Sequence, residues 1–117
     1  MKTLLSAAFL ALMTLPASAI DFTRIQSERA FRNFVVDRLL VDDFGGRMLL
    51  GSNGSVSGQI DKNILRGGWA WRGGQLCRRL VIGSVDQGIE CQVVFVRANQ
   101  LVIERPNYGQ SLSYTIQ

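Results

Sequence analysis

The feature that most constrains this chain is a run of extended segments joined by short turns, from about residue 47 to residue 117. Apolar and polar residues alternate along these segments, as they do on strands with one buried face. No helical segment separates them, and parallel strands would need long crossovers, so the turns predict antiparallel neighbours throughout. The predicted strands occupy residues 47–52, 55–61, 67–72, 75–82, 89–97, 100–105 and 110–116.

Seven to eight short antiparallel strands are most economically closed into a small barrel, because closure leaves no exposed sheet edge. The eighth strand depends on residues 36–41, which either extend a preceding helix or begin the sheet. Asn53-Gly54 predicts a hairpin with a type I′ turn, since both residue types tolerate positive φ. We therefore predict one all-β domain at residues 20–117, a lipocalin-like up-and-down barrel.

A short amphipathic helix is predicted at about residues 27–36. Ser27 is a suitable N-cap, and Glu28 suits the first turn of a helix. Four apolar residues recur at helical spacing and form one stripe: Ala30, Phe31, Phe34 and Val35. So short a helix cannot bury its stripe alone, so we expect it to cover one end or one side of the barrel.

Residues 1–19 have the pattern of a secretory signal peptide. Lys2 supplies the positive start and residues 4–15 supply the apolar core, which is too short to span a bilayer. Small residues end the segment and predict cleavage between Ala19 and Ile20. We expect a periplasmic or secreted product without a membrane span.

The two cysteines, Cys77 and Cys91, fall on adjacent predicted strands, and the midpoint between them is Ser84, inside a predicted turn. A hairpin folded there sets them directly opposite each other, with Cβ atoms about 4.5–5.5 Å apart, close to disulfide geometry. An even cysteine count in an exported chain favours a structural disulfide. A redox pair would need C-x-x-C spacing and a zinc site four ligands, so we expect neither.

The composition excludes several classes of function. Histidine is absent, which removes the commonest general base and the commonest metal ligand. No glycine motif has the spacing that binds nucleotides, so we expect no catalytic residue, no metal and no cofactor. The net charge is +4, but the arginines are scattered along the chain. Proteins that bind nucleic acids gather their basic residues on one face, so this function is not expected.

Two pairs of residues stand out as candidates for a binding site. Trp69 and Trp71 share one face of a predicted strand, where such side chains line either a ligand pocket or a packed core. Arg78 and Arg79 point to opposite faces of the next strand. Whichever faces the interior either forms a structural ion pair with a carboxylate or binds an anion in the mouth of the barrel. Four carboxylates are candidates for that partner: Asp61, Asp86, Glu90 and Glu104. We name Trp69, Trp71 and Arg79 as the candidate ligand-binding residues.

The pattern Gly68-x-x-Trp71-x-x-Gly74-x-x-Cys77-Arg78, followed by Cys91-Gln92, resembles that of a family of small exported proteins from Gram-negative bacteria. The resemblance covers about residues 27–116. Some members carry the name dihydrodipicolinate reductase. A true reductase of that name has two domains, a Rossmann glycine motif and a catalytic segment with histidine and lysine. This chain has no histidine and no βαβ unit, so that activity is not expected.

These features favour a non-catalytic binding or interaction module, either a carrier of a small ligand or an inhibitor of another envelope protein. The alternative is a structural or stress-related envelope protein without a small ligand, and an enzyme ranks third. A water-accessible cavity between the tryptophans would favour the carrier. A fully packed interior with an exposed apolar patch would favour a protein partner.

Overall fold

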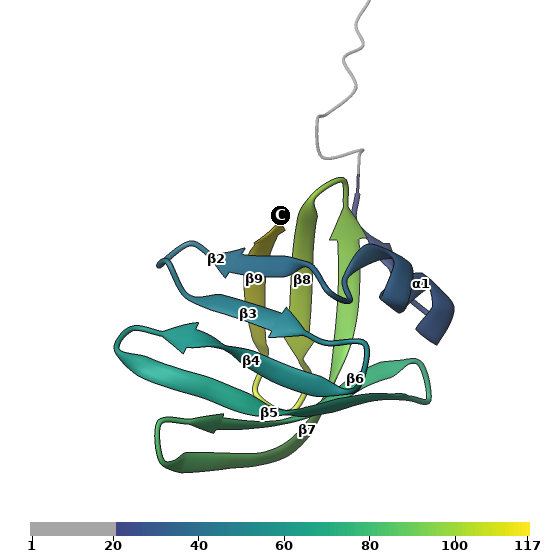
Figure 1. The fold of residues 1–117 in the computed structure, drawn as a ribbon. Helices are drawn as coiled ribbons and strands as arrows, with labels where there is room; N and C mark the ends of the chain where they lie inside the picture. The colour runs from purple at the N-terminus through teal and green to yellow at the C-terminus, as the bar shows by residue number, and fades with distance from the viewer. Residues whose placement is uncertain (1–20) are drawn as a thin grey trace, which may run out of the picture.

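The alternating segments form a closed antiparallel barrel of eight strands (Figure 1). The computed structural model describes residues 21–117, so the predicted signal peptide at residues 1–19 lies outside the described residues. The barrel strands are β2 (Leu39–Asp42), β3 (Arg47–Leu50), β4 (Ser55–Ile60), β5 (Asn63–Arg72), β6 (Gln75–Ile82), β7 (Val85–Arg97), β8 (Gln100–Arg105) and β9 (Gln110–Ile116). Each pairs with its successor, and β9 pairs back with β2. The predicted all-β barrel is confirmed.

Strand β2 answers the question that residues 36–41 left open. Asp37 takes a φ of 63°, which turns the chain after the helix, and β2 begins two residues later at Leu39. Leu40 then lies opposite Met48 of β3 and opposite Ile116 of β9. This strand closes the barrel, because β3 and β9 would otherwise present two free edges.

Two strands begin four residues earlier than predicted, because the turns before them are shorter. β5 begins at Asn63 and β7 at Val85, where residues 67 and 89 were expected. Asp61 (φ 54°) and Gly83 (φ 62°) each start a two-residue turn with positive φ. A positive φ at that position matches the twist of the flanking strands and allows so tight a reversal.

The hairpin at Asn53-Gly54 forms, but the predicted type I′ turn is wrong. Gly54 has a φ of 89°, whereas Asn53 is not among the described residues with positive φ. Gly51 accepts a 2.9 Å hydrogen bond from the Gly54 N–H, and its own N–H donates to Ser55 over 2.8 Å. The loop therefore has three residues and ends in a left-handed glycine, the second common hairpin form.

A ninth strand, β1 (Thr23–Arg24), was not predicted and is not one of the eight strands that close the barrel. β6 pairs with β7 only as far as Gln92, and β1 continues the ladder beyond that point, opposite Phe95 and Val96. β7 is long enough to need both neighbours, since it has 13 residues and β6 has 8. β1 thus covers an edge of β7 that would otherwise be unpaired.

The predicted helix is α1 (Glu28–Phe34), slightly shorter than the expected range. Ser27 caps it as predicted, because its Oγ accepts a 3.1 Å hydrogen bond from the Ala30 N–H. Figure 1 shows α1 beside the start of β2 and the arrowhead of β3. Phe31 is fully buried beneath it, while Phe34 is 46% exposed. Only one part of the predicted apolar stripe therefore packs into the barrel.

The core fills the barrel with side chains from the inward faces of its strands. The largest fully buried side chains are those of Phe31, Val35, Leu40, Leu50, Leu65, Leu76, Val94, Leu101 and Ile103. Two inward positions are glycine because neighbouring backbone approaches closely. A Cβ at Gly58 would lie 2.0 Å from the Arg47 carbonyl oxygen, and one at Gly67 would lie 1.8 Å from that of Arg79. Glycine there allows the strands to bend into a small barrel.

The predicted disulfide between Cys77 and Cys91 is confirmed. The two residues are direct cross-strand partners on β6 and β7, with Cα atoms 3.9 Å apart. The chain reverses between them at Gly83 and Ser84, the place that the midpoint count indicated. A bulge between Arg79 and Val81 takes up the residues that do not pair.

Candidate functional site

The two ends of the barrel differ, and the register of β5 and β6 defines them. Trp71 lies opposite Leu76 at one end of this strand pair, and Leu65 lies opposite Ile82 at the other. The tryptophans therefore belong to one end of the barrel, which we call the helix end because α1 covers it. We call the other the open end. Arg78 stands between them, opposite Trp69.

The helix end is filled. The ring of Phe31 lies 5.3 Å from that of Trp69 and 4.9 Å from that of Trp71, measured between centroids. Trp69 is 8% exposed, and its Nε1 donates a 2.8 Å hydrogen bond to the carbonyl oxygen of Gly51. Both tryptophans face inward, but no ligand cavity lies between them, because the helix supplies an aromatic side chain that occupies the space.

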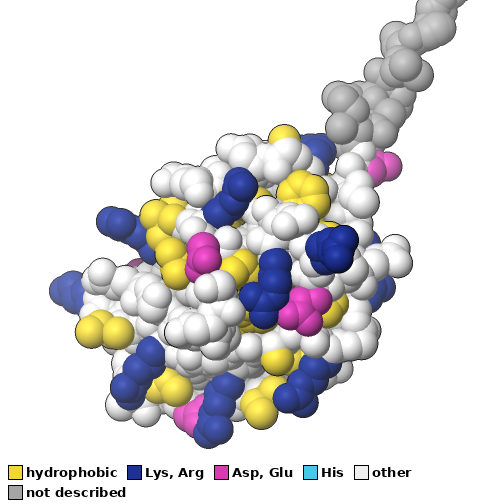
Figure 2. Space-filling view, turned by 45° about the vertical axis from the view of Figure 1, so that its right-hand side comes forward, with side chains coloured by type: hydrophobic (Ala, Val, Ile, Leu, Met, Phe, Trp, Pro, Cys, Tyr) yellow, Lys and Arg dark blue, Asp and Glu magenta, His cyan; other side chains and the backbone are white. Residues whose placement is uncertain are grey.

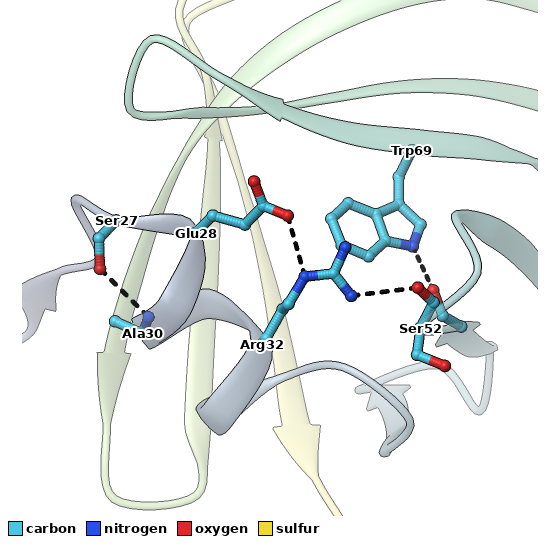
Figure 3. Close-up of polar contacts among 7 residues, drawn as sticks. Ser27, Glu28, Ala30, Arg32, Ser52 and Trp69 are labelled. Atoms are coloured by element: carbon cyan, nitrogen blue, oxygen red, sulfur yellow. Dashed lines mark hydrogen bonds and ion pairs between the residues drawn. The ribbon is translucent and has the colours of Figure 1, made fainter.

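Polar contacts at the surface hold α1 over this end (Figure 3). The Arg32 guanidinium lies 5.0 Å from the centroid of the Trp69 ring. Its Nε donates to Glu28 over 2.9 Å, and its Nη1 donates to the Ser52 carbonyl oxygen over 3.1 Å. Arg32 therefore links the helix to the β3–β4 loop. Both its guanidinium and the indole N–H of Trp69 have hydrogen-bond acceptors within the protein.

Arg79, the arginine chosen from the sequence, lies on the outer face of β6. Its side chain is 59% exposed and pairs with Asp86 of β7. The hydrogen bonds from Arg79, with one from the Gly88 N–H, lower the pKa of the Asp86 carboxyl. The structure therefore brings Trp69 and Trp71 together on the inner face of the barrel wall, but it places Arg79 on the outer face.

Arg78 is the arginine that faces the interior, and it is only 3% exposed. Its cross-strand neighbours are Trp69 on β5 and Glu90 on β7. Nη1 lies 2.8 Å from the Met48 sulfur, and Nε has no hydrogen-bond acceptor within residues 21–117. A thioether is a weak, uncharged acceptor, so the protein buries this cation with its hydrogen-bonding capacity only partly met.

Glu90 is the carboxylate nearest in register to Arg78, but its hydrogen bonds go elsewhere. Arg105 donates two hydrogen bonds of 2.7 Å to the Glu90 carboxylate, from its Nε and Nη2. Gln92 adds a 2.6 Å bond from its Nε2. The Arg105 bonds lower the pKa of the Glu90 carboxyl, and Glu90 in turn raises the pKa of Arg105. Glu90 is therefore the one of the four candidate carboxylates that lies opposite Arg78 in the sheet. Its oxygens accept hydrogen bonds from Arg105 and Gln92 instead of from Arg78.

Gln92 contributes a second unsatisfied group. Its side chain is buried, with 3% of the residue exposed, and its Oε1 accepts no hydrogen bond from the described residues. Arg78 Nε and Gln92 Oε1 are the only buried side-chain nitrogen or oxygen atoms in residues 21–117 that lack a partner. Both belong to inward-facing residues of the β6–β7 pair.

These groups border a pocket of about 220 Å³ at the open end. Its polar lining consists of Asp42, Arg78, Gln87, Glu90, Gln92, Arg105 and Tyr114, and the rest of the lining consists of Ile60, Leu80, Ile82, Gly88 and Leu112. Tyr108, from the β8–β9 turn, stacks on Arg105 with its ring centroid 4.1 Å from Cζ. A larger hollow beside β1 and α1 is lined mainly by exposed residues and contains neither unsatisfied atom.

Counting along the hairpin could have identified Arg78. The turn at Gly73-Gly74 has positive φ at both residues, as in a two-residue hairpin loop. Such a loop sets Trp69 opposite Arg78, and cross-strand partners share a face. Gln92 and Arg105 carried no such local signal, because their roles depend on contacts across β7 and β8.

Comparisons of the chain with protein-family models, with curated proteins and with solved structures found no match. The resemblance to a family of small exported proteins therefore stays a prediction. Among residues 21–117, no helix combines the length and apolarity needed to cross a membrane. The same residues contain no group of three or more His, Cys, Asp or Glu side chains placed to hold a metal ion. Figure 2 shows one face of the molecule, on which the basic side chains lie apart from one another.

Proposed function

We propose that this protein is a non-catalytic binding module that holds one small ligand in the open end of its barrel. The observation that carries the proposal is the buried Arg78 guanidinium, whose Nε lacks an acceptor among residues 21–117 and which lines a pocket of about 220 Å³. A buried polar group without a partner is rare in native proteins and calls for a water, an ion or a ligand to complete it. The apolar walls of this pocket favour a ligand.

The volume limits the ligand to a small molecule. Pockets for drug-sized ligands measure about 300–1,000 Å³, and each molecule of liquid water occupies about 30 Å³. A pocket of about 220 Å³ therefore holds the equivalent of about seven waters. The arrangement of an apolar wall around a few polar groups is typical of sites that orient a metabolite.

Two observations support binding without catalysis. The chain contains no histidine. Glu90, a carboxylate inside the pocket, has a lowered pKa, and both its oxygens accept hydrogen bonds from Arg105. A general acid or base needs a pKa near the working pH and a free lone pair or proton directed at the substrate. Glu90 is suited instead to holding Arg105 in place.

We further propose that the protein works in a periplasm or outside the cell. Disulfides such as Cys77–Cys91 persist in oxidising compartments. The predicted signal peptide supports the same location. In a Gram-negative host, fractionation of cells that express the full chain should recover it in the periplasm with no free thiol. Recovery of a reduced protein in the cytoplasm would contradict this location.

Native mass spectrometry of the protein purified from its own compartment tests the function. We expect a bound small molecule that is lost in Leu80→Trp, which fills the pocket, and is retained in Val81→Trp, on the outer face of the same strand. Tryptophan fluorescence provides a second measurement, because Trp69 lies opposite Arg78. If a polypeptide co-purifies instead, or if Leu80→Trp binds as well as the wild type, the proposal is wrong.

A further inference from the structure

We infer that the ligand is a short monocarboxylic acid with a hydrogen-bond donor, a hydroxyl or an ammonium group, on the carbon beside the carboxylate. The inference rests on the proposed function and names the ligand class for the same pocket. It follows from the two unsatisfied atoms, Arg78 Nε and Gln92 Oε1, a donor and an acceptor that belong to two residues lining the pocket.

The donor side favours an anion. Arg78 is buried, and within the described residues its one hydrogen bond goes to the Met48 sulfur, which carries no charge. The oxygens of Glu90 accept from Arg105 and Gln92. Asp42, the other carboxylate of the pocket, accepts from backbone N–H groups, so within the described residues neither carboxylate forms a hydrogen bond with Arg78. A planar guanidinium binds a carboxylate better than any neutral acceptor, since the bonds are charge-assisted and match its geometry.

The acceptor side requires a donor, and the orientation of the Gln92 amide can be assigned. Glu90 accepts from Arg105 through both oxygens, so it is an acceptor toward Gln92 as well. The amide must therefore turn its NH₂ group to Glu90, which directs Oε1 elsewhere. An anion alone would leave Oε1 unsatisfied, so the ligand has to carry an N–H or O–H group.

The two residues occupy neighbouring positions in the lining of one pocket. Arg78 pairs with Glu90, and Leu76 pairs with Gln92, so Arg78 and Gln92 are diagonal neighbours on the inward face of β6 and β7. Diagonal neighbours lie about 7–8 Å apart, within the reach of two long side chains that converge on one ligand. We place the donor on the carbon beside the carboxylate, because a pocket of about 220 Å³ holds only a short ligand.

The remainder of the pocket determines charge and size. Asp42 and Glu90 both line it, and their carboxylates oppose a second negative charge on the ligand. Asp42 is held in place by hydrogen bonds from the N–H groups of Phe44 (2.8 Å) and Gly46 (2.7 Å). Leu80, Ile82 and the other apolar walls suit a short branched hydrocarbon chain.

Four probes that share one hydrocarbon chain test the inference by calorimetry on the oxidised protein. They are α-hydroxyisovalerate, L-valine, isovalerate, which lacks the donor, and isoamyl alcohol, which lacks the carboxylate. We expect the alcohol to bind at least about tenfold more weakly than the acid, and isovalerate about fivefold more weakly than its better donor-bearing analogue. Whether the hydroxy or the amino acid binds more tightly identifies the donor.

Matched variants assign each difference to a residue. Arg78→Met should remove the preference for the acid over the alcohol, and Gln92→Leu should remove the advantage of the donor. Arg79→Met, the neighbouring arginine on the outer face, should bind like the wild type. The comparison of ligands on the wild-type protein remains informative even if Arg78→Met does not fold.

Equal binding of isovalerate and isoamyl alcohol to the wild type would overturn the inference but leave the proposed function intact, because a ligand still occupies the pocket. The inference would also be overturned if none of the four probes binds at about 10 mM, a concentration well above the dissociation constants of specific ligands. The proposed function is tested separately, by native mass spectrometry of the wild type and of Leu80→Trp, and these four probes do not decide it.

Discussion

The helix end and the open end of the barrel are built from the same strands, yet they differ in how completely their side chains are satisfied. At the helix end, Phe31 fills the space beside two tryptophans, and Trp69 Nε1 has a backbone acceptor. At the open end, Arg78 and Gln92 are equally buried but retain unsatisfied atoms. The comparison teaches that one end stabilises the fold, while the other keeps buried polar groups without a partner among residues 21–117, which is where we propose that a ligand binds.

The largest expected effect is at the helix end. Phe31→Ala should lower the free energy of unfolding by about 3–5 kcal/mol, because it leaves a cavity between the two tryptophans. Phe34→Ala is the control on the same helix, since Phe34 is 46% exposed and should change stability little. Urea denaturation measures both. Similar losses in the two variants would show that the helix does not plug the barrel.

The next largest effect concerns the disulfide that joins β6 to β7. Replacing both Cys77 and Cys91 with serine should lower the free energy of unfolding by about 3 kcal/mol, because the crosslink closes a loop of about 15 residues in the unfolded chain. Denaturant unfolding of the oxidised wild type and of the double variant provides the measurement. A loss below about 1 kcal/mol would mean that the paired strands hold their register unaided.

A smaller effect, dependent on pH, is expected at the open end. Glu90→Gln should destabilise the protein by about 1–3 kcal/mol near neutral pH, because Arg105 loses its carboxylate. Glu90 has a folded-state pKa below its ordinary value of 4.5, so its contribution is complete above that value and is lost as the pH falls through the folded pKa. The difference between the variant and the wild type should therefore shrink in acid.

Thermal unfolding between about pH 7 and pH 3 provides the measurement. A difference that persists unchanged at the acid end of this range would show that the carboxylate charge is not the cause. Asp86→Asn is the matched control, because Asp86 also has a lowered pKa but its pair with Arg79 is exposed.

The smallest effect is expected on the outer face. Arg79→Ala removes an exposed ion pair, and such pairs contribute little because water screens them. Its unfolding midpoint in urea should match that of the wild type within error. A loss as large as that of Glu90→Gln would mean that the outer face supports the open end, and the contrast between the two arginines of β6 would fail.

The strands, their antiparallel order and the disulfide could be predicted because their signals are local. Alternation of apolar residues and turn residues such as Gly73-Gly74 fix the hairpins, and a count about Ser84 pairs the cysteines. The candidate site could be predicted only in part. No local pattern reveals that Phe31 occupies the space beside the tryptophans, or that Arg105 on β8 reaches Glu90 on β7 across 15 residues of sequence.

The position of the disulfide has a consequence for where the pocket can operate. Cys77 is the immediate neighbour of Arg78, and Cys91 stands between Glu90 and Gln92. The disulfide therefore links the two strands that carry the groups of the proposed site, and it prevents one strand from shifting along the other. A newly synthesised chain with reduced thiols lacks this crosslink. We therefore expect it to bind the proposed ligand only after the two thiols have been oxidised.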